Sequence, residues 1–307
     1  MAPNGCSGTI VVHKASKDSF PQLIVAKSSS KKEVEKTAPL STWDRYQLAS
    51  HKDRPGTVDY IQALFTEFSE LHGDRAFGDD PAAICGLGRF DGNPVMIIGQ
   101  EMGKEPRERQ LRNFGMMHPE GYRKAMRVMN IASRFGIPVL VFVDTKGAYP
   151  GVGAEERGQS EAIARNLRDM YKLRVPVVVT VVGAGASGGA LGIAVGDRVL
   201  MMENAWYNVI SPEGCAAIIW GDPEEAKKNS PKAADALKIT AEENKKLGVI
   251  DDIIREPNGG AHLDQQGAIE AVRAAIRRNL SDLAKLSPEQ LIEKRFEKYR
   301  RIGVFAE

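Results

Sequence analysis

The chain has 307 residues, of which 42% are hydrophobic and 27% are charged, and its formal net charge is +2 at pH 7. This composition is ordinary for a globular protein with a sizeable core, and the balanced charge argues against a nucleic-acid-binding surface. The sequence has no run of the roughly 18 to 20 apolar residues that a membrane-spanning helix needs. We therefore expect a cytoplasmic protein with no membrane and no nucleic-acid partner.

The cysteines and the N-terminal segment indicate the compartment and the domain limits. Cys6, Cys85 and Cys215 are widely separated and odd in number, which is typical of a reducing compartment and excludes a CxxC metal site. Residues 1–40 are rich in Ser and Lys, as plastid transit segments are, but they lack arginine. We predict a flexible polar tail over residues 1–40 and one folded domain over residues 41–307, with the plastid stroma as the location if the tail is a transit segment.

The first predicted elements of the domain are a helix and a hairpin. Apolar positions within residues 57–71 recur at helical spacing, the first residue can act as N-cap, and Gly73 follows. Two short apolar runs come next, Ile84–Phe90 and Pro94–Gly99. They are joined by Asp91-Gly92, a pair that tolerates positive φ, so we predict a β-hairpin.

Beyond the hairpin, helices and apolar strands alternate. We predict helices over residues 121–135, 161–173, 183–194 and 269–283, and strands over residues 138–143, 175–182, 198–202 and 207–210. Strands as apolar as these are typically buried on both faces. The alternation indicates βαβ units, a largely parallel sheet and hence an α/β fold.

Two glycine-rich turns directly follow predicted strands, where open α/β sheets build their ligand sites. The first glycine turn is Asp144–Gly153 and the second glycine turn is Gly183–Ala190. Neither matches a Walker A motif or a dinucleotide fingerprint. Glycine allows a backbone to approach a ligand, and free N–H groups at a helix start stabilise an oxyanion. Tight turns with close helix packing explain the same glycines, and the pattern alone favours neither interpretation.

The second glycine turn also fits the GxSxG motif of a nucleophile elbow, with Ser187 at its centre. The order Ser187, then Asp251 or Asp252, then His262 is that of an α/β-hydrolase triad. His262 lies in a polar loop, however, and the short motif arises easily in a glycine-rich sequence. We interpret Ser187 as a cap or packing residue and keep a serine hydrolase as the alternative.

Other polar residues give weaker indications. Four basic residues between Lys104 and Arg112 could contact phosphates, but acidic residues among them indicate a solvated helix face. The acidic pair Glu155-Glu156 is better explained as the first turn of a helix than as an acid/base pair. The histidines show no HExxH spacing, so we predict no metal on this chain.

Several long and unusual strings of residues resemble one known family. They are Arg112–Met116, His118–Ala125, the first glycine turn with its continuation to Ala164, and Val209–Ala216. Each is similar to the carboxyltransferase alpha subunits of multi-subunit, biotin-dependent acetyl-CoA carboxylases. The resemblance runs from about Trp43 to the C-terminus, and strings of this length are far more specific than a short motif.

This resemblance implies a crotonase-like (ClpP/crotonase) fold of ββα superhelical units and an active site shared with a homologous beta subunit. The implied reaction transfers the carboxyl group of carboxybiotin to acetyl-CoA and gives malonyl-CoA for fatty-acid synthesis. It implies that the backbone N–H groups of Gly188 and Gly189 form an oxyanion hole for the biotin ureido oxygen. The implied substrate- and biotin-binding residues are Gly147, Ala148, Tyr149, Pro150, Gly151, Val152, Gly153 and Ser187.

The resemblance also implies partners and cofactors. The biotin is carried on a biotin carboxyl carrier protein and not on this chain, the CoA thioester is the acceptor, and ATP is used by the biotin carboxylase component. Zinc belongs to a ribbon on the beta subunit, and the assembly is an alpha2beta2 heterotetramer.

One departure from the family concerns the second glycine turn. Ala184-Gly185-Ala186-Ser187 stands where family members often have Glu-Gly-Gly-Ser, and an alanine at position 186 requires an allowed φ. A non-catalytic scaffold is therefore a further alternative.

Overall fold

The computed structural model describes residues 40–303, and the predicted tail, apart from Leu40, lies outside the described residues. The strands are β1 (Phe65–Glu70), β2 (Ala83–Phe90), β3 (Asn93–Gln100), β4 (Val139–Thr145), β5 (Val177–Ala186), β6 (Arg198–Met202), β7 (Trp206–Asn208) and β8 (Asp252–Ile254). The helices are α1 (Thr42–Leu48), α2 (Thr57–Leu64), α3 (Pro106–Leu111), α4 (Pro119–Phe135), α5 (Val152–Glu156), α6 (Gln159–Met170), α7 (Ser187–Leu191), α8 (Pro212–Trp220), α9 (Pro223–Leu237), α10 (Ala241–Lys246), α11 (Gln265–Leu283) and α12 (Pro288–Arg300), with short 3-10 turns at Asn113–Gly115 and Pro257–Gly259.

The strands form one sheet in the order β1-β2-β3-β4-β5-β6-β8, with β7 paired to the end of β5. β1, β2 and β3 are antiparallel, whereas β3, β4, β5, β6 and β8 are parallel. All residues of β4 and β5 are buried, as expected for central parallel strands. The predicted α/β class with a largely parallel sheet is therefore confirmed.

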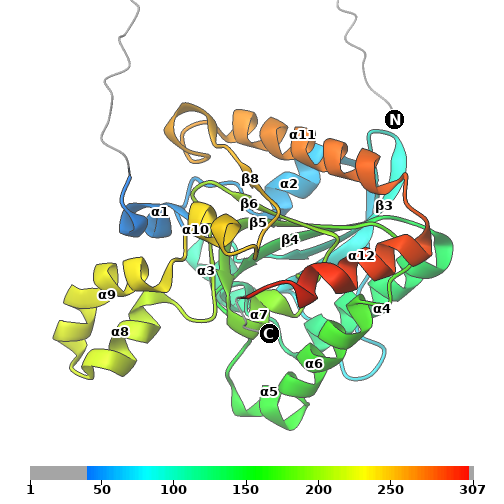
Figure 1. Ribbon diagram of the computed structural model, residues 1–307. Coiled ribbons are helices and arrows are strands. Elements are labelled where there is room, and N and C mark those ends of the chain that lie inside the picture. Colours follow the sequence, from blue (N-terminus) through cyan, green and yellow to red (C-terminus); the bar gives the residue numbers. More distant parts are fainter. Residues whose placement is uncertain (1–39, 304–307) are drawn as a thin grey trace, which may run out of the picture. The chain divides into compact units, whose positions relative to one another are not determined.

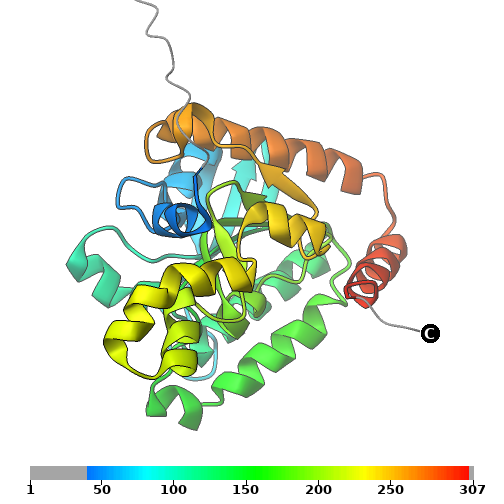
Figure 2. The ribbon, with the colours of Figure 1, turned by 60° about the vertical axis from the view of Figure 1, so that its left-hand side comes forward.

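Helices cover both faces of this sheet. In Figure 1, α2 and α11 lie on one side of the strands, and α4 and α6 lie on the other. Figure 2 shows α8 and α9, in yellow, as a pair at one end of the fold beside α1. The hydroxyl of Tyr46 in α1 donates to Glu213 in α8 over 2.6 Å. Within residues 40–303, no helix has both the length and the apolar character needed to cross a bilayer.

The predicted hairpin is confirmed. β2 and β3 pair without interruption from Ala83↔Gln100 to Phe90↔Asn93. Asp91 and Gly92 form the turn with φ values of 49° and 80°. Two successive positive φ angles give the turn whose twist suits a two-residue hairpin.

The predicted helix over residues 57–71 is wrong in its second half, because α2 ends at Leu64 and β1 follows directly. A bulge in β1 explains the misleading spacing: Thr66 pairs with Arg89 and Ser69 with Leu87, so β1 has one residue more than its partner. With that extra residue, apolar positions in a strand are spaced as they are in a helix. The N-cap of α2 is Gly56 and not Thr57, the first residue of the helix.

The predicted helix over residues 183–194 is also largely wrong. Residues 183–186 continue β5, and α7 contains only five residues. The reason is tertiary pairing: Ala184, Gly185 and Ala186 pair with β7, and Gly185 also pairs with Thr145 of β4. This backbone is held extended from both sides.

The other predicted elements are confirmed within a few residues at each end, with β7 ending before Val209. The sequence prediction missed β8 and the helices α1, α8, α9, α10 and α12, whereas the helix face expected between Lys104 and Arg112 and the helical turn expected at Glu155-Glu156 correspond to α3 and α5. Several of these are short, and α8 and α9 have little of their surface facing the sheet.

Candidate active site

The structure brings the two glycine turns into contact. They leave the carboxyl ends of β4 and β5, which are parallel neighbours in the sheet. A Cβ on Gly189 would overlap the backbone of Gly147 and Ala148. Gly147 itself has a φ of 138°, and its N–H and carbonyl are both bound by the hydroxyl of Thr145, at 3.1 and 2.7 Å. Only glycine fits at 189, and this close approach is what aligns the two turns.

The short helix α7 is held by side chains from three other elements, β3, α4 and α6. The carbonyl of Gly189 accepts from Nε2 of Gln100 over 2.8 Å and from the hydroxyl of Tyr122 over 3.1 Å. The carbonyl of Gly192 accepts from Nδ2 of Asn166 over 3.0 Å. These buried donors fix the position of the helix start.

Within the described part of the chain, the N–H groups at the start of α7 have no acceptor. A first-turn N–H has no partner inside its helix, and the N-cap residue Ala186 provides no side-chain cap. Ala186 has φ −97° and ψ 126°, an extended conformation open to any residue, so the alanine at this position is accommodated. Ser187 instead carries the unusual φ of 58°. The strained residue of the turn is thus the serine.

An apolar cavity of about 320 Å³ borders this helix start. Ser187, Gly188 and Leu191 form one wall. The opposite walls come from β7, α10 and their flanking residues, namely Tyr207, Asn208, Val209, Lys238, Asn244, Leu247 and Val249. A volume of this size is within the range of small-molecule sites.

The later residues of the first glycine turn lie apart from this lining. The ring of Tyr149 stacks on His118 with centroids 4.1 Å apart, and its carbonyl accepts from Gln159 over 3.0 Å. Pro150 is exposed, and Gly151, Val152 and Gly153 lead into α5, with Val152 75% exposed. Among the predicted residues, Gly147 and Ala148 lie against Gly189, and the segment from Tyr149 to Gly153 forms an adjacent surface.

The hydrolase triad is not assembled. His262 packs against the ring of His51, with centroids 4.7 Å apart, and burial lowers its pKa. Asp251 pairs with Lys298, and Asp252 pairs with Lys245 over 2.7 Å. Among the hydrogen bonds of residues 40–303, none links Ser187 to His262 or His262 to either aspartate.

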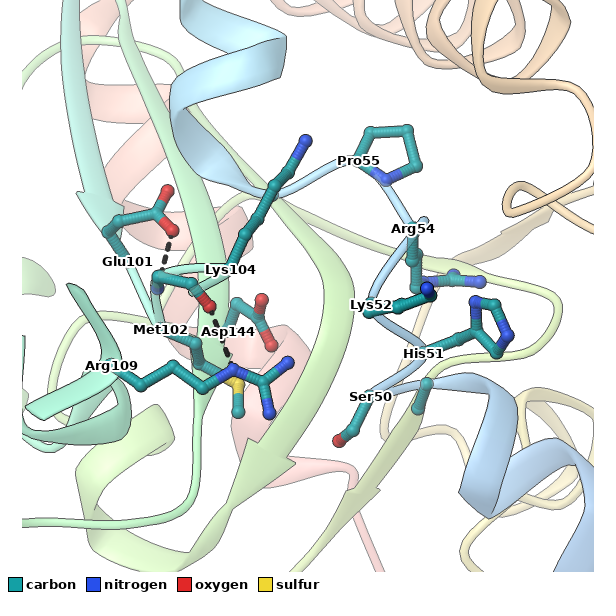
Figure 3. Close-up of a pocket in the computed structure, with 13 residues that line it drawn as sticks. Ser50, His51, Lys52, Arg54, Pro55, Glu101, Met102, Lys104, Arg109 and Asp144 are labelled. Carbon is teal, nitrogen blue, oxygen red and sulfur yellow. Dashed lines mark hydrogen bonds between the residues drawn. The ribbon is translucent and has the colours of Figure 1, made fainter. Parts of the chain in front are cut away.

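A second cavity, of about 30 Å³ and lined mainly by polar and charged residues, lies between α3 and the segment that joins α1 to α2, next to Asp144 at the start of the first glycine turn. Figure 3 shows Asp144 and Arg109 among the side chains that line it. Burial raises the pKa of Asp144 to about 7, and the nearby Glu101 acts in the same direction. Burial likewise raises the pKa of Glu101. Sequence patterns did not single out Asp144 or Glu101, because nothing local to them reveals their burial.

The sequence prediction also missed the cavity walls formed by β7 and α10. Its closest indication was the string Val209–Ala216, which carried the family resemblance without an assigned role. Lys238 and Leu247 lie in segments with no distinctive pattern, and only the fold brings them to Gly188. No group of three or more His, Cys, Asp or Glu side chains suited to a metal is found within residues 40–303.

Comparison with known proteins identifies the family. A model of the family described as acetyl co-enzyme A carboxylase carboxyltransferase-like matches residues 14–303, beginning earlier than Trp43. The acetyl-coenzyme A carboxylase carboxyl transferase subunit alpha of Geobacter metallireducens is 56% identical over 270 residues, covering 88% of this chain and 84% of the relative. The subunit of that name from Staphylococcus carnosus is 52% identical over 287 residues, covering 93% and 90%.

Solved structures show the same fold. Transcarboxylase 12S, with methylmalonyl-coenzyme A and methylmalonic acid bound, matches with a TM-score of 0.63 at 20% identity, over 77% of this chain and 43% of that one. The beta subunit of P. aeruginosa geranyl-CoA carboxylase matches with a TM-score of 0.60 at 16% identity, over 82% and 46%. This chain spans less than half the length of either. The likeness confirms the crotonase-like fold, and at this identity it shows the fold alone.

The family match and the relatives agree on a transferase, and the unassembled triad removes the support for a hydrolase. The chain belongs to the family of carboxyltransferase alpha subunits of acetyl-CoA carboxylase.

Proposed function

We propose that the N–H groups of Gly188 and Gly189 stabilise the negative charge that develops when a carboxyl group passes from carboxybiotin to acetyl-CoA, giving malonyl-CoA. The observation that carries this proposal is a helix start without a side-chain cap, held by buried donors, at the edge of an apolar cavity. Charge that appears only during reaction is best stabilised by donors already in place. No side-chain nucleophile or metal is needed for that role.

The residues at the cavity fit a biotin ring system. The bicyclic ring has apolar faces and one polar ureido edge, which matches apolar walls next to backbone donors. When bound, the group delivers the carboxyl and its ureido oxygen takes up negative charge. In this arrangement Leu191, Val209 and Leu247 would contact the ring faces, while Gly188 presents its N–H. Ser187 and the turn from Gly147 to Gly153 would line the approach to the same site.

The relatives' names as subunit alpha imply a beta subunit, and the surface next to the cavity supports one. Val209 and Leu247, which line the cavity, are 77% and 51% exposed. Exposed apolar side chains near a site are typical of an interface. We infer that the CoA thioester is bound largely by that partner, which carries the zinc ribbon.

The remaining components follow from the same reaction. A biotin carboxyl carrier protein would deliver the biotin, and a biotin carboxylase would consume ATP to load it. We propose an alpha2beta2 core in the cytoplasm, or in the plastid stroma if residues 1–40 are a transit segment.

A matched pair of substitutions at Gly188 tests the oxyanion role. A Cβ at this residue has its nearest neighbour, Cγ2 of Ile163, at 4.0 Å, so Gly188→Ala fits and keeps the N–H. Gly188→Pro removes the N–H at a position in the first helical turn, where proline is tolerated. Loss of one oxyanion donor lowers kcat by about 10²- to 10³-fold. We expect that loss for the proline variant and less than about a threefold change for the alanine variant.

The assay is carboxyl transfer between malonyl-CoA and biotin, with this chain alone, the beta subunit alone and both co-expressed. Activity only in the mixture supports a shared site. Full activity of Gly188→Pro in an assembled complex would reject the oxyanion role and favour a non-catalytic scaffold.

A further inference from the structure

The strand that leads into the second glycine turn is irregular just before the turn. Val143 of β4 pairs with Val181 of β5, but Thr145 pairs with Gly185. β5 therefore uses four residues where β4 uses two, and residues 182–184 form a bulge. Backbone groups within a bulge leave the regular ladder and need other partners.

Two buried side chains supply those partners. Nε of Arg54 donates to the carbonyl of Val182 over 2.8 Å, and Oδ1 of Asp144 accepts from the N–H of Ala184 over 2.8 Å. Arg54 is 5% exposed and Asp144 is 8% exposed. A Cβ on Gly183 would overlap the Asp144 carboxyl, so the glycine between the two contacts is required by this arrangement.

We infer that Asp144 and Arg54 are positioning residues for carboxyl transfer, which hold the β5 bulge and thereby place the N–H groups at Gly188 and Gly189. The inference rests on the oxyanion site proposed above. The bulge lies only three residues before Ser187, and both ends of the connection are constrained. Upstream the strand is buried between β4 and β6, and downstream the carbonyl of Gly189 is bound by Gln100 and Tyr122.

The surroundings of Asp144 make its hold on the bulge sensitive to pH. Arg54 is engaged by Glu256 through two bonds of 2.9 and 2.6 Å, and Asp144 forms no ion pair with a basic residue of the described chain. Glu101, at the end of β3, faces Asp144, and so does Arg109 from α3.

Burial, with Glu101 adding to it, raises the pKa of Asp144 to about 7, while the Ala184 N–H, Arg54 and Arg109 oppose that rise. Near neutral pH the carboxyl therefore changes from a neutral acceptor to an ionised one. An ionised acceptor binds an N–H more strongly than a neutral one. The bulge is held most firmly above pH 7.

The test compares Asp144→Ala, which removes the acceptor, with Asp144→Asn, which keeps an acceptor oxygen but does not titrate. Both are assembled with the beta subunit. We expect Asp144→Ala to lower kcat at least tenfold with less than a threefold change in KM for malonyl-CoA. Asp144→Asn should recover kcat to within about threefold of the wild type, and its rate should lack the acid limb that the wild type shows near pH 7.

Asp282→Asn is the matched control, because Asp282 is an exposed aspartate of α11 whose surface pair with Lys285 contributes little to stability. It should leave kcat of the folded complex and the acid limb unchanged. Hydrogen exchange of the peptide over residues 181–186 gives a readout independent of activity. It should rise in Asp144→Ala and remain at the wild-type level in Asp144→Asn and in the control.

Unchanged exchange in Asp144→Ala would overturn the positioning role, whatever the activity. Loss of activity in Asp144→Asn equal to that in Asp144→Ala would also overturn it, since the retained acceptor would then have no effect. Raised exchange with full kcat in Asp144→Ala would instead reject the oxyanion site while leaving the link from Asp144 to the bulge in place.

Discussion

The two ends of β5 are fastened in the same way but differ in how their charges are compensated. At the start of the strand, Asp197 accepts from the N–H of Val177 and is bound by Arg295 through two bonds of 3.0 and 2.8 Å. At the end of the strand, Asp144 accepts from the N–H of Ala184. The nearby Arg54 is paired with Glu256 and not with Asp144.

This difference separates a structural aspartate from one poised for function. The Asp197–Arg295 pair is buried on both sides, and further Arg295 N–H groups bind the carbonyls of Met170, Leu173 and Val175. The burial of Asp144 is only partly compensated, which costs stability and raises its pKa. Groups with perturbed pKa values gather at functional sites, and the end of β5 that carries the perturbation is the end that leads to the glycine turn.

The largest expected effect is at the compensated end. Asp197→Asn leaves the guanidinium of Arg295 buried without its carboxylate, and breaking a buried ion pair costs about 3–5 kcal/mol. The free energy of unfolding, measured with urea, should fall by that amount. Arg300→Met, at an exposed residue of the same helix as Arg295, is the control and should cost less than about 1 kcal/mol. An equal fall in the free energy of unfolding in the two variants would show that the buried Asp197–Arg295 pair stabilises the protein no more than an exposed residue does.

Asp144→Asn should raise the free energy of unfolding, in contrast to Asp197→Asn, and the size of the increase should depend on pH. The native pKa of about 7 lies above the ordinary 3.8, so the native state binds the Asp144 proton more tightly than the unfolded state does. This tighter proton binding stabilises the native state fully below pH 4, and the stabilisation is lost as the pH rises to 7.

The stability of the variant relative to the wild type should therefore increase across this range, by up to about 4 kcal/mol for a shift of about three units. Urea unfolding at pH 4 and pH 8 measures the change. A stability difference that stays constant with pH would show that Asp144 is ionised throughout, and the two ends of β5 would then be alike.

The smallest effect is expected at Ser187, the first residue after β5. Its φ of 58° costs a non-glycine residue about 1–2 kcal/mol, part of which glycine returns through its greater freedom when unfolded. Ser187→Gly should stabilise the protein by about 0.5–1 kcal/mol and keep carboxyl transfer within threefold. Ser281→Gly, at an exposed position of α11, should instead destabilise it by about 0.5–1 kcal/mol. Complete loss of activity in Ser187→Gly would instead support a nucleophilic role for the serine.

Much of the fold could be predicted from local patterns. The hairpin over Asp91-Gly92, the helices α4, α6 and α11, and the strands β4, β5 and β6 all followed from periodicity and turn residues. Failures came where pairing with distant residues decided the conformation. The bulge in β1 gave strand residues a helical spacing, and pairing with β7 kept residues 183–186 extended despite their small side chains.

In the candidate site, too, some features follow from local sequence and others from contacts between distant residues. The sequence by itself determined the two glycine turns, because they depend on residue types at short spacing, and Gly189 lies against Gly147 as glycine alone permits. It also gave the family, and with it the crotonase-like fold, through the resemblance of several long strings of residues. Only the tertiary structure decided which walls complete the cavity and that Asp144 and Arg54 bind the bulge. Burial and charge compensation are sums over residues far apart in the chain, and no local pattern records them.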